Sequence, residues 1–349
     1  MLKVGLVGLP NAGKSTLFNA LVSSNKADVK PHPFTTIDKN IGSSNIPDDN
    51  LQKIAKKEKI NKVTPAIITF VDIAGLIKDA HIGEGLGNQF LHHIREVDLI
   101  LHVVRLFNDK NVAHIYSEID PERDIQIVNE ELLFSDIQTI KKRLSNKGLS
   151  EKENNILKEV LQEMDKGVLA SDEKSQEKLK DIKEPLFLLT SKKQIFALNI
   201  DENQISNTPK INIESDGYLY ICAKLESQIE DVPLSERVEF LKLYGLKEEV
   251  KNSIINLCYK ALDLITFYTI AKRSEAKAWI LHKGETAIKA AGKIHTDFAE
   301  KFIKVEQINV RDFIKEESWN RAKDDGKIIT HGRDYIVQNG DVLEFKINS

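Results

Sequence analysis

The amino-acid sequence predicts an α/β fold: a doubly wound, mainly parallel sheet with an inserted helical hairpin and a smaller β-grasp domain after it. Three observations support this prediction. Short apolar strands alternate with helices in the first part, a polar stretch of helical periodicity interrupts them, and short strands joined by turns come last. We therefore expect a first domain over residues 1–265, interrupted by a helical arm at 124–183, and a second domain over 266–349.

The first strand, residues 2–7, leads into the loop Gly-Leu-Pro-Asn-Ala-Gly-Lys-Ser at 8–15, which fits the pattern G-x-x-x-x-G-K-[ST]. The two glycines let successive backbone N–H groups face phosphate oxygens, at the start of a helix. Lys14 adds a cation near the outer phosphates and Ser15 a ligand for Mg²⁺. The expected nucleotide contacts here are Gly8, Asn11, Ala12, Gly13, Lys14, Ser15 and Thr16. A turn without ligand is the alternative to this P-loop.

A polar loop with two prolines follows the first helix, at residues 30–37. In such a switch segment a threonine hydroxyl can complete the magnesium shell when the outer phosphate is present. We expect Thr36 to take this role, with Thr35 as the alternative. An ordinary surface loop would show the same composition.

The next strand ends in Asp72-Ile73-Ala74-Gly75. Nucleotide hydrolases place at this point a carboxylate that binds magnesium through water, so Asp72 is expected to do this and the Gly75 amide to contact the outer phosphate. Leu76 follows where many GTPases carry a glutamine that orients the attacking water. An aliphatic side chain makes no hydrogen bond, so hydrolysis is expected to be slow or to use another group.

His114 is a candidate for that other group. It lies beyond the apolar strand 99–104, on the side of the sheet where the phosphates are expected. An imidazole can accept or donate a proton, and it can also be an ordinary structural or surface histidine. The catalytic candidates are therefore Lys14 and His114.

Residues 124–183 have a different composition, with apolar residues at helical intervals and charged residues between them. A glycine break near 148 and the pair Ser150 and Glu153, which fits a capping box, divide the stretch into two helices. We expect an antiparallel, coiled-coil-like hairpin that serves as an interaction arm. The alternative is a solvated helical pair without a partner.

The strand 194–198 ends in Asn199-Ile200-Asp201-Glu202, where GTPases carry N-K-x-D. Ile200 replaces the lysine and Glu202 the aspartate, so guanine loses its main advantage over adenine. We expect Asn199 to brace the P-loop and Ile200 to pack on the base. The strand 218–221 then leads into Cys222 and Ala223, whose backbone is expected near the base.

The last part of the chain predicts strands at 276–281, 302–308, 335–337 and 342–347 around a helix at 286–292. A mixed sheet around a helix is a β-grasp. Four basic residues are candidates for an RNA-facing surface, although such charges usually form a solvated face: Lys289, Lys293, His295 and Lys301.

The composition describes a soluble cytoplasmic protein. The 349 residues carry a net charge of −3, without the basic excess typical of nucleic-acid binding by charge alone. The apolar runs are too short to cross a membrane. The two cysteines, Cys222 and Cys258, have no spacing for metal or redox chemistry and indicate a reducing compartment.

Taken together, these motifs resemble the YchF-type branch of the Obg-related P-loop NTPases, and the resemblance covers essentially the whole chain. Its motifs are the P-loop, the Pro33–Ile37 loop, the 72–76 box, the 83–91 segment, the His-Val-Val-Arg strand at 102–105 and the N-x-x-E box. The sequence differs from the family pattern at Ala12, Thr35 and residues 79–81, which are positions that do not define the motifs.

The resemblance implies an ATPase that prefers ATP to GTP, with Ile200 at the backbone position that contacts adenine. It also implies binding to the ribosome or its large subunit, RNA and protein. A TGS domain at the C-terminal end and a catalytic role for His114 are implied as well. We expect a monomeric, ribosome-associated ATPase that uses Mg²⁺, hydrolyses ATP slowly and acts as a switch in translation or stress regulation. The alternatives are a GTP-specific assembly factor and a nucleotide-sensing scaffold with negligible hydrolysis.

Overall fold

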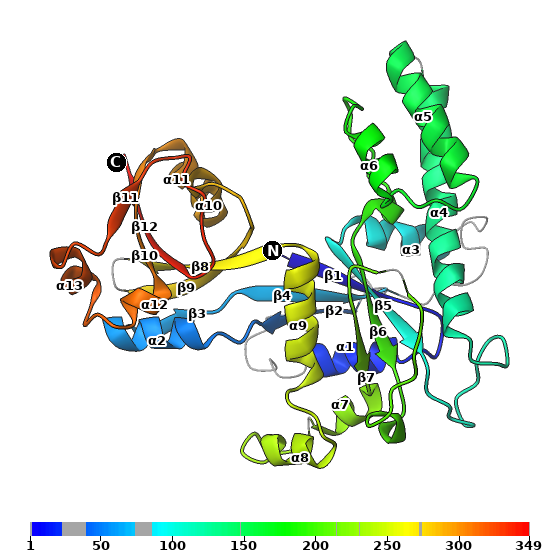
Figure 1. Ribbon diagram of the computed structural model, residues 1–349, viewed down its shortest axis with the longest axis horizontal. Coiled ribbons are helices and arrows are strands. Elements are labelled where there is room, and N and C mark those ends of the chain that lie inside the picture. The colour runs from blue at the N-terminus through cyan, green and yellow to red at the C-terminus, as the bar shows by residue number, and fades with distance from the viewer. Residues whose placement is uncertain are drawn as a thin grey trace. The chain divides into compact units, whose positions relative to one another are not determined.

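The computed structural model describes residues 2–22, 40–73, 86–146, 148–213, 215–229, 231–271 and 274–348 (Figure 1). The chain divides into two compact units. The nucleotide unit contains residues Leu2–Ser44 and Thr69–Ala261, and the C-terminal unit contains Asn45–Ile68 and Leu262–Ser349. The division expected from the sequence was therefore wrong for residues 45–68, which belong to the C-terminal unit.

The nucleotide unit is built on a six-stranded sheet in the order β2-β4-β1-β5-β6-β7. The strands are β2 (Asn40–Asn45), β4 (Ile67–Asp72), β1 (Leu2–Val7), β5 (Leu99–Arg105), β6 (Gln194–Asn199) and β7 (Tyr218–Ile221). Strands β1, β5, β6 and β7 are parallel, so their carboxyl ends share one edge. Every residue of β5 is buried, as expected for a central strand covered on both faces. The predicted doubly wound α/β fold is confirmed.

Helices of the nucleotide unit connect these strands. They are α1 (Lys14–Val22), α3 (Leu86–Arg95), α4 (Pro121–Ser145), α5 (Glu151–Met164), α6 (Glu173–Leu179), α7 (Ala223–Ile229), α8 (Arg237–Leu243) and α9 (Val250–Ala261). One buried cluster packs α3 and the first half of α4 on the sheet, with Phe90, Ile94, Val128 and Leu132 against Val7 and Val71. This packing fixes the start of α4 close to the end of β1.

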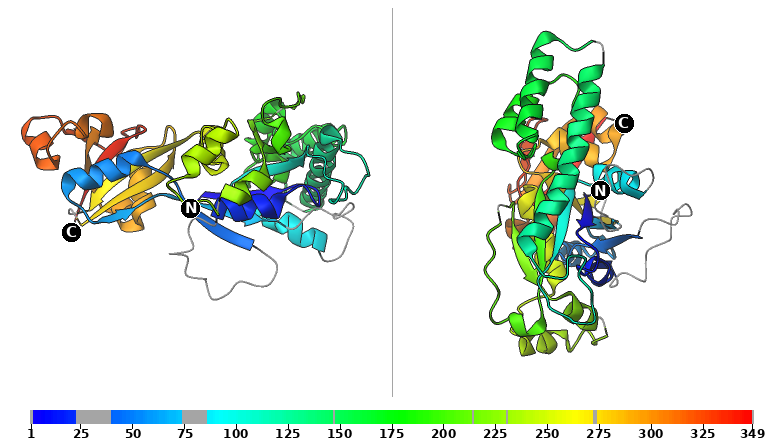
Figure 2. Two further views of the ribbon diagram at one scale, coloured as in Figure 1. Left: turned by 90° about the horizontal axis from the view of Figure 1, so that it is seen from below. Right: turned by 90° about the vertical axis from the view of Figure 1, so that its right-hand side faces the viewer.

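The second half of α4 forms a hairpin with α5, and both views of Figure 2 show the two helices side by side. Asp120 caps α4 by accepting the Arg123 N–H, and the capping box predicted for Ser150 and Glu153 begins α5. Apolar side chains from both helices are buried together, among them Ile137, Ile140, Leu157 and Val160. The predicted helical hairpin is confirmed, and its first helix begins at Pro121.

The C-terminal unit has a mixed six-stranded sheet in the order β11-β10-β12-β8-β9-β3. The strands are β11 (Ile329–His331), β10 (Phe302–Asn309), β12 (Asp341–Ile347), β8 (Leu264–Ala271), β9 (Glu275–His282) and β3 (Lys62–Thr64). Helices α10 (Ala287–Ile294) and α11 (Thr296–Glu300) cover one face, as a β-grasp requires. A strand predicted at 335–337 is wrong, because only a single bridge between Thr286 and Ile336 forms there.

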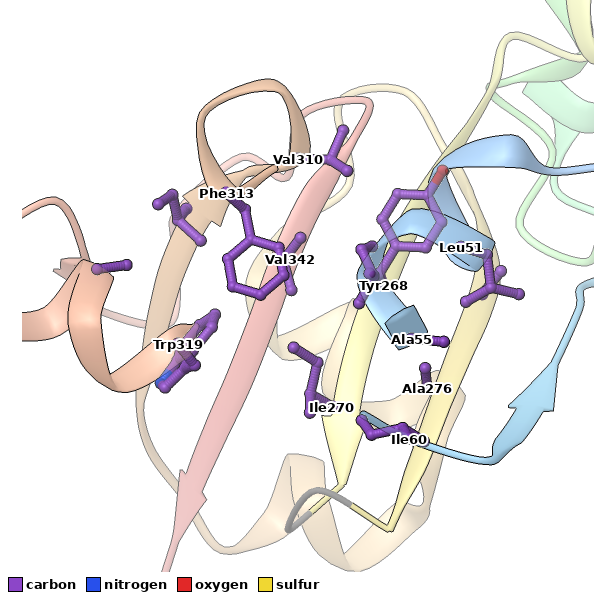
Figure 3. Close-up of a cluster of buried hydrophobic side chains, with 14 of the residues drawn as sticks. Leu51, Ala55, Ile60, Tyr268, Ile270, Ala276, Val310, Phe313, Trp319 and Val342 are labelled. Carbon is purple, nitrogen blue, oxygen red and sulfur yellow. The ribbon is translucent and has the colours of Figure 1, made fainter. Parts of the chain in front are cut away.

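The other face of this sheet is covered by α2 (Asp49–Glu58), α12 (Val310–Phe313) and α13 (Trp319–Asp324). Leu51 and Ala55 of α2 lie over Tyr268 and Ala276 of the sheet (Figure 3). Strand β3 pairs in parallel with β9 beside this helix. The segment 45–68 thus contributes both an edge strand and a buried helix, which explains why it belongs to this unit.

Candidate nucleotide-binding site

The loop between β1 and α1 has three residues with positive φ angles, a conformation that favours glycine and asparagine. Gly8 and Gly13 have φ angles of 146° and 98°, and Asn11 has a φ of 62°. A Cβ on Gly8 would lie 2.3 Å from the Val103 carbonyl oxygen, and one on Gly13 would lie 2.3 Å from Nδ2 of Asn199. Both glycines are therefore required by space as well as by conformation.

Lys14 begins α1 with its side chain inside the loop. The ammonium donates to the carbonyl oxygens of Gly8 (3.0 Å) and Leu9 (2.9 Å), and the residue is 8% exposed. Burial lowers the pKa of Lys14 to about 8, against an opposing effect from the Asp72 carboxylate. A cation held here in a poorly solvated place attracts phosphate oxygens strongly.

Ser15 and Asp72 meet beside Lys14, although 57 positions separate them in the sequence. The Ser15 hydroxyl donates to Oδ2 of Asp72 at 2.9 Å, and the carboxylate is buried at the end of β4. A hydroxyl and a carboxylate are hard oxygen donors, so this pair fits Mg²⁺. The other expected residues of this end of the site, Thr36 with its alternative Thr35, Gly75 and Leu76, lie outside the described residues.

Asn199 joins the P-loop to the loop after β7. Its Nδ2 donates to the Ala12 carbonyl oxygen at 2.9 Å, and its Oδ1 accepts the Ala223 N–H at 3.0 Å. The buried amide thus bonds to two loops at once, which sets the distance between them. This is the bracing position that the sequence suggested for Asn199.

A pocket of about 510 Å³ opens next to these loops. It is lined by Gly13, Thr16, Phe107, Asp109, Val112, Asn199, Ile200, Asp201, Glu202, Asn203, Cys222, Ala223, Lys224 and Ser227. Seven of the expected nucleotide-binding residues line this pocket: Gly13, Thr16, Asn199, Ile200, Glu202, Cys222 and Ala223. Phe107, Asp109 and Val112 were missed, although their position directly after strand β5 is a signal for such residues.

The walls of this pocket differ in polarity. Ile200 is 3% exposed and packs mainly into the protein with Val104 and Leu198, so it supports the wall from behind. Glu202 lies at the polar end, where its Oε1 is 3.3 Å from Nζ of Lys224. Burial raises the pKa of the Cys222 thiol, which keeps this side chain neutral. The pocket therefore has a mixed lining, with the apolar side chains of Phe107 and Val112 on one part and the charged pair Glu202 and Lys224 on another.

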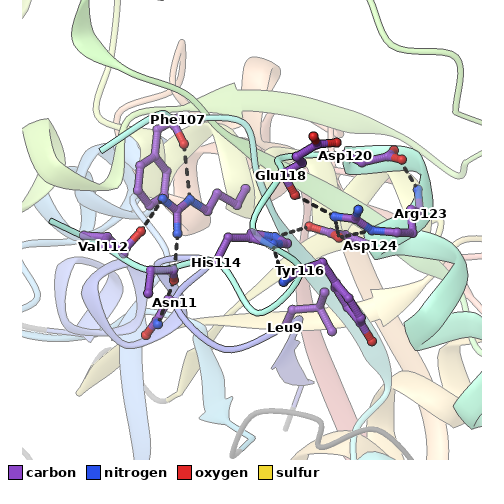
Figure 4. A network of polar contacts seen from close by, with 12 residues as sticks. Leu9, Asn11, Phe107, Val112, His114, Tyr116, Glu118, Asp120, Arg123 and Asp124 are labelled. Atoms are coloured by element: carbon purple, nitrogen blue, oxygen red, sulfur yellow. Dashed lines mark hydrogen bonds and ion pairs between the residues drawn. The ribbon is translucent and has the colours of Figure 1, made fainter. Parts of the chain in front are cut away.

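Arg105, at the end of β5, holds the loop 107–113 in place. Its buried guanidinium donates to the carbonyl oxygens of Phe107 (3.2 Å), Val112 (2.8 Å) and Ala113 (3.2 Å). The Ala113 carbonyl oxygen also accepts from Nδ2 of Asn11 at 3.0 Å (Figure 4). One arginine thus fixes a pocket wall against the P-loop.

His114 follows this loop, and its ring is directed toward Asp124 of α4 (Figure 4). Nε2 lies 2.8 Å from Oδ2 of Asp124, and both side chains are 4% exposed. Nδ1 accepts the backbone N–H of Tyr116 at 3.2 Å. Both ring nitrogens therefore have partners within the protein.

The four basic candidates of the C-terminal unit are exposed around α10 and α11. His295 joins the two helices, where its Nδ1 accepts the Asp297 N–H at 3.2 Å. Among the described residues, no helix is long and apolar enough to cross a membrane. In the same part of the chain no group of three or more His, Cys, Asp or Glu side chains has the arrangement of a metal site.

A glycine loop with a buried lysine, a serine–aspartate pair beside that lysine and an adjoining pocket at one sheet edge define a P-loop nucleotide-binding protein. Family models agree with this class. Residues 3–142 match the family described as 50S ribosome-binding GTPase, and residues 264–348 match the C-terminal family of YchF GTPases, described as a protein of unknown function.

Curated relatives are similar over the whole length. The chain is 37% identical to the ribosome-binding ATPase YchF of Bacillus subtilis over 365 aligned positions, which cover 99% of both chains. It is 38% identical to the protein of the same name in Escherichia coli O157:H7, again over 99% of both. The solved structure of the Schizosaccharomyces pombe YchF GTPase matches with a TM-score of 0.81 and 30% identity, over 99% of this chain and 97% of that one. The chain belongs to the YchF family.

Proposed function

We propose that this protein is a ribosome-associated ATPase that binds and slowly hydrolyses ATP with Mg²⁺ and acts as a nucleotide-dependent switch in translation or stress regulation. The observation that carries the proposal is the base pocket. Its polar end presents Glu202 paired with Lys224, and an isoleucine stands where guanine-specific proteins carry a lysine. The names of the curated relatives, which are ribosome-binding ATPases, support the same function.

The phosphate end supports hydrolysis by positioning and electrostatics. The loop amides and the Lys14 ammonium hold the phosphates. Ser15 would hold magnesium directly, Asp72 would hold it through water, and Thr36 would complete the set. When bound, the ion neutralises charge that develops on the phosphate oxygens. Leu76 offers no hydrogen bond to a water, so His114 is the candidate to assist the attacking water, and slow turnover is expected.

The ribosome would be contacted by the helical hairpin or by the C-terminal unit. The hairpin of α4 and α5 is expected to form a coiled-coil arm, and the C-terminal unit a TGS domain with Lys289, Lys293, His295 and Lys301 as RNA-facing candidates. The protein would work as a cytoplasmic monomer without membrane contact. Loss of ribosome co-sedimentation when these four side chains are changed to alanine would support the C-terminal unit as the main contact.

GTP is the competing substrate, because the S. pombe relative is described as a GTPase. The test is equilibrium binding of ATP and GTP analogues, with magnesium, to wild type and to an Ile200→Lys, Glu202→Asp double variant. We expect wild type to prefer ATP and the double variant to shift toward GTP, by about tenfold or more in the affinity ratio. Tighter binding of GTP by wild type would contradict the proposal. A scaffold function would appear as binding without single-turnover hydrolysis.

A further inference from the structure

His114 lies between two parts of the nucleotide unit. The peptide before it contacts the P-loop, where the Ala113 carbonyl oxygen accepts from Asn11 at 3.0 Å. Its ring instead contacts helix α4, with Nε2 at 2.8 Å from Oδ2 of Asp124 (Figure 4). The backbone of this residue is therefore next to the phosphate loop, whereas the position of its ring is set by α4.

The hydrogen bonds of the ring define where its proton lies. Nδ1 accepts the Tyr116 N–H, so in the neutral imidazole the proton is on Nε2, which donates it to Asp124. A general base needs a free nitrogen lone pair directed at the water that it deprotonates. In this arrangement neither nitrogen has one. The ring must leave Asp124 and Tyr116 before it can assist hydrolysis.

Asp124 is arranged so that the ring can leave. Its other oxygen, Oδ1, accepts from Arg123, with Nη2 at 3.1 Å and Nε at 3.3 Å. Arg123 is in turn held by the Glu118 carbonyl oxygen at 2.8 Å and lies over the Tyr116 ring. A buried carboxylate without a partner would be strongly unfavourable. Release of His114 breaks its hydrogen bonds with Asp124 and with the Tyr116 N–H, but the Asp124 carboxylate keeps Arg123 as a partner.

On the basis of the proposed function, in which His114 assists hydrolysis, we propose that Asp124 is a positioning residue that holds the His114 ring away from the phosphates and limits the basal rate. Asp124 lies in the first turn of α4, a helix of 25 residues whose second half forms the hairpin with α5. The residue that controls His114 therefore belongs to the helix that continues into the hairpin and not to the nucleotide loops.

The test is steady-state ATP hydrolysis by the full-length protein with magnesium. The variants are Asp124→Ala, Asp124→Asn, His114→Ala and the Asp124→Ala, His114→Ala double variant. Glu122→Ala is the matched control, because it removes an exposed acid from the same helical turn. We expect Asp124→Ala to raise kcat about three- to tenfold, the effect of losing one such hydrogen bond, with little change in KM. Asp124→Asn keeps an acceptor oxygen and should raise kcat less.

The double variant should hydrolyse ATP as slowly as His114→Ala, because the effect of Asp124 acts only through the ring. A fall or no change in kcat for a folded Asp124 variant, or a double variant faster than His114→Ala, would overturn the inference. If His114→Ala is as fast as wild type, the role of His114 in the proposed function fails instead. A second readout is the ¹⁵N spectrum of the His114 ring, which should change in Asp124→Asn and stay unchanged in Glu122→Ala. An unchanged spectrum in folded Asp124→Asn also overturns the inference.

Discussion

Lys14 shows at the residue scale how binding and stability oppose each other. Its ammonium is enclosed by the P-loop, and burial lowers its pKa from 10.5 to about 8. The folded protein therefore holds this proton less tightly than the unfolded chain does. Below pH 8 both states carry the charge, so the full cost of burying it is present. Functional sites commonly accept such a cost because the buried charge is what binds the ligand.

Replacing Lys14 by methionine should therefore stabilise the nucleotide-free protein while abolishing ATP binding. We expect the free energy of unfolding at pH 7 to rise by about 1 to 3 kcal/mol, since a lowered pKa of this size is partly offset by two lost hydrogen bonds. Between pH 8 and 10.5 wild type loses the buried charge and gains stability, so the difference between the two proteins should shrink. Urea denaturation at several pH values measures this difference in the free energy of unfolding between wild type and the methionine variant. A difference that grows with pH would contradict the explanation.

The site residues that can be located most directly from the sequence are those defined by local spacing. Gly8, Gly13 and Lys14 are defined by their spacing; the backbone geometry requires the two glycines, and the Lys14 ammonium donates to the Gly8 carbonyl oxygen within the same loop. The ring of His114 could not be placed in this way. Its direction depends on Asp124, ten positions later in a separate helix, and no spacing rule links a loop histidine to a helical acid.

At the scale of elements, a buried carboxylate adds to the apolar packing that attaches α4 to the body of the nucleotide unit. Asp136 accepts the N–H groups of Leu189 (2.7 Å) and Thr190 (2.8 Å) and the Thr190 hydroxyl (2.7 Å). Burial raises the pKa of Asp136, and the hydrogen bonds from Thr190 and Leu189 oppose that rise. These bonds lie where α4 leaves the sheet and enters the hairpin, so they set the position of the hairpin's base.

Asp136→Ala should loosen this attachment. It leaves two buried N–H groups unpaired, and we expect a loss of about 2 to 4 kcal/mol in the free energy of unfolding. Hydrogen exchange should rise first at Leu189 and Thr190. Glu130→Ala, which removes an exposed acid from the same helix, is the control and should change stability by less than about 0.5 kcal/mol. Equal effects of the two substitutions would show that the hydrogen bonds of Asp136 do not hold the helix.

Helices and strands could be predicted where a motif in neighbouring residues marks them. Strands that form only by pairing with a distant part of the chain were missed. The capping box of Ser150 and Glu153 marks the start of α5 in the sequence and in the structure. Strand β3 has only three residues, and its partner in β9 is more than two hundred positions away. Such a short strand has no periodicity that could identify it, because its existence depends on the sheet edge that it meets.

At the scale of the whole molecule, the C-terminal unit depends on a segment from the first fifth of the chain. Helix α2 buries Leu51, Ile54 and Ala55 in the core that also contains Phe313 and Trp319. The hydroxyl of Tyr268 donates to the Asp48 carboxylate at 2.9 Å, and Nζ of Lys57 donates to the Glu316 carbonyl oxygen at 2.8 Å. Residues 262–349 alone would leave the part of this apolar face that α2 covers exposed to water.

Ile54→Ala tests this dependence, because Ile54 is fully buried and lies far from the C-terminal unit in sequence. Removing its side chain from a packed core should cost about 2 to 5 kcal/mol. The loss should appear as faster hydrogen exchange in β8, β9 and β12, whereas β1 and β5 keep their protection. Leu157→Ala in α5 is the matched control, since it removes an equally buried side chain from the nucleotide unit. If Ile54→Ala instead loosened β1 and β5 first, the segment 45–68 would belong energetically to the nucleotide unit, as the sequence alone had indicated.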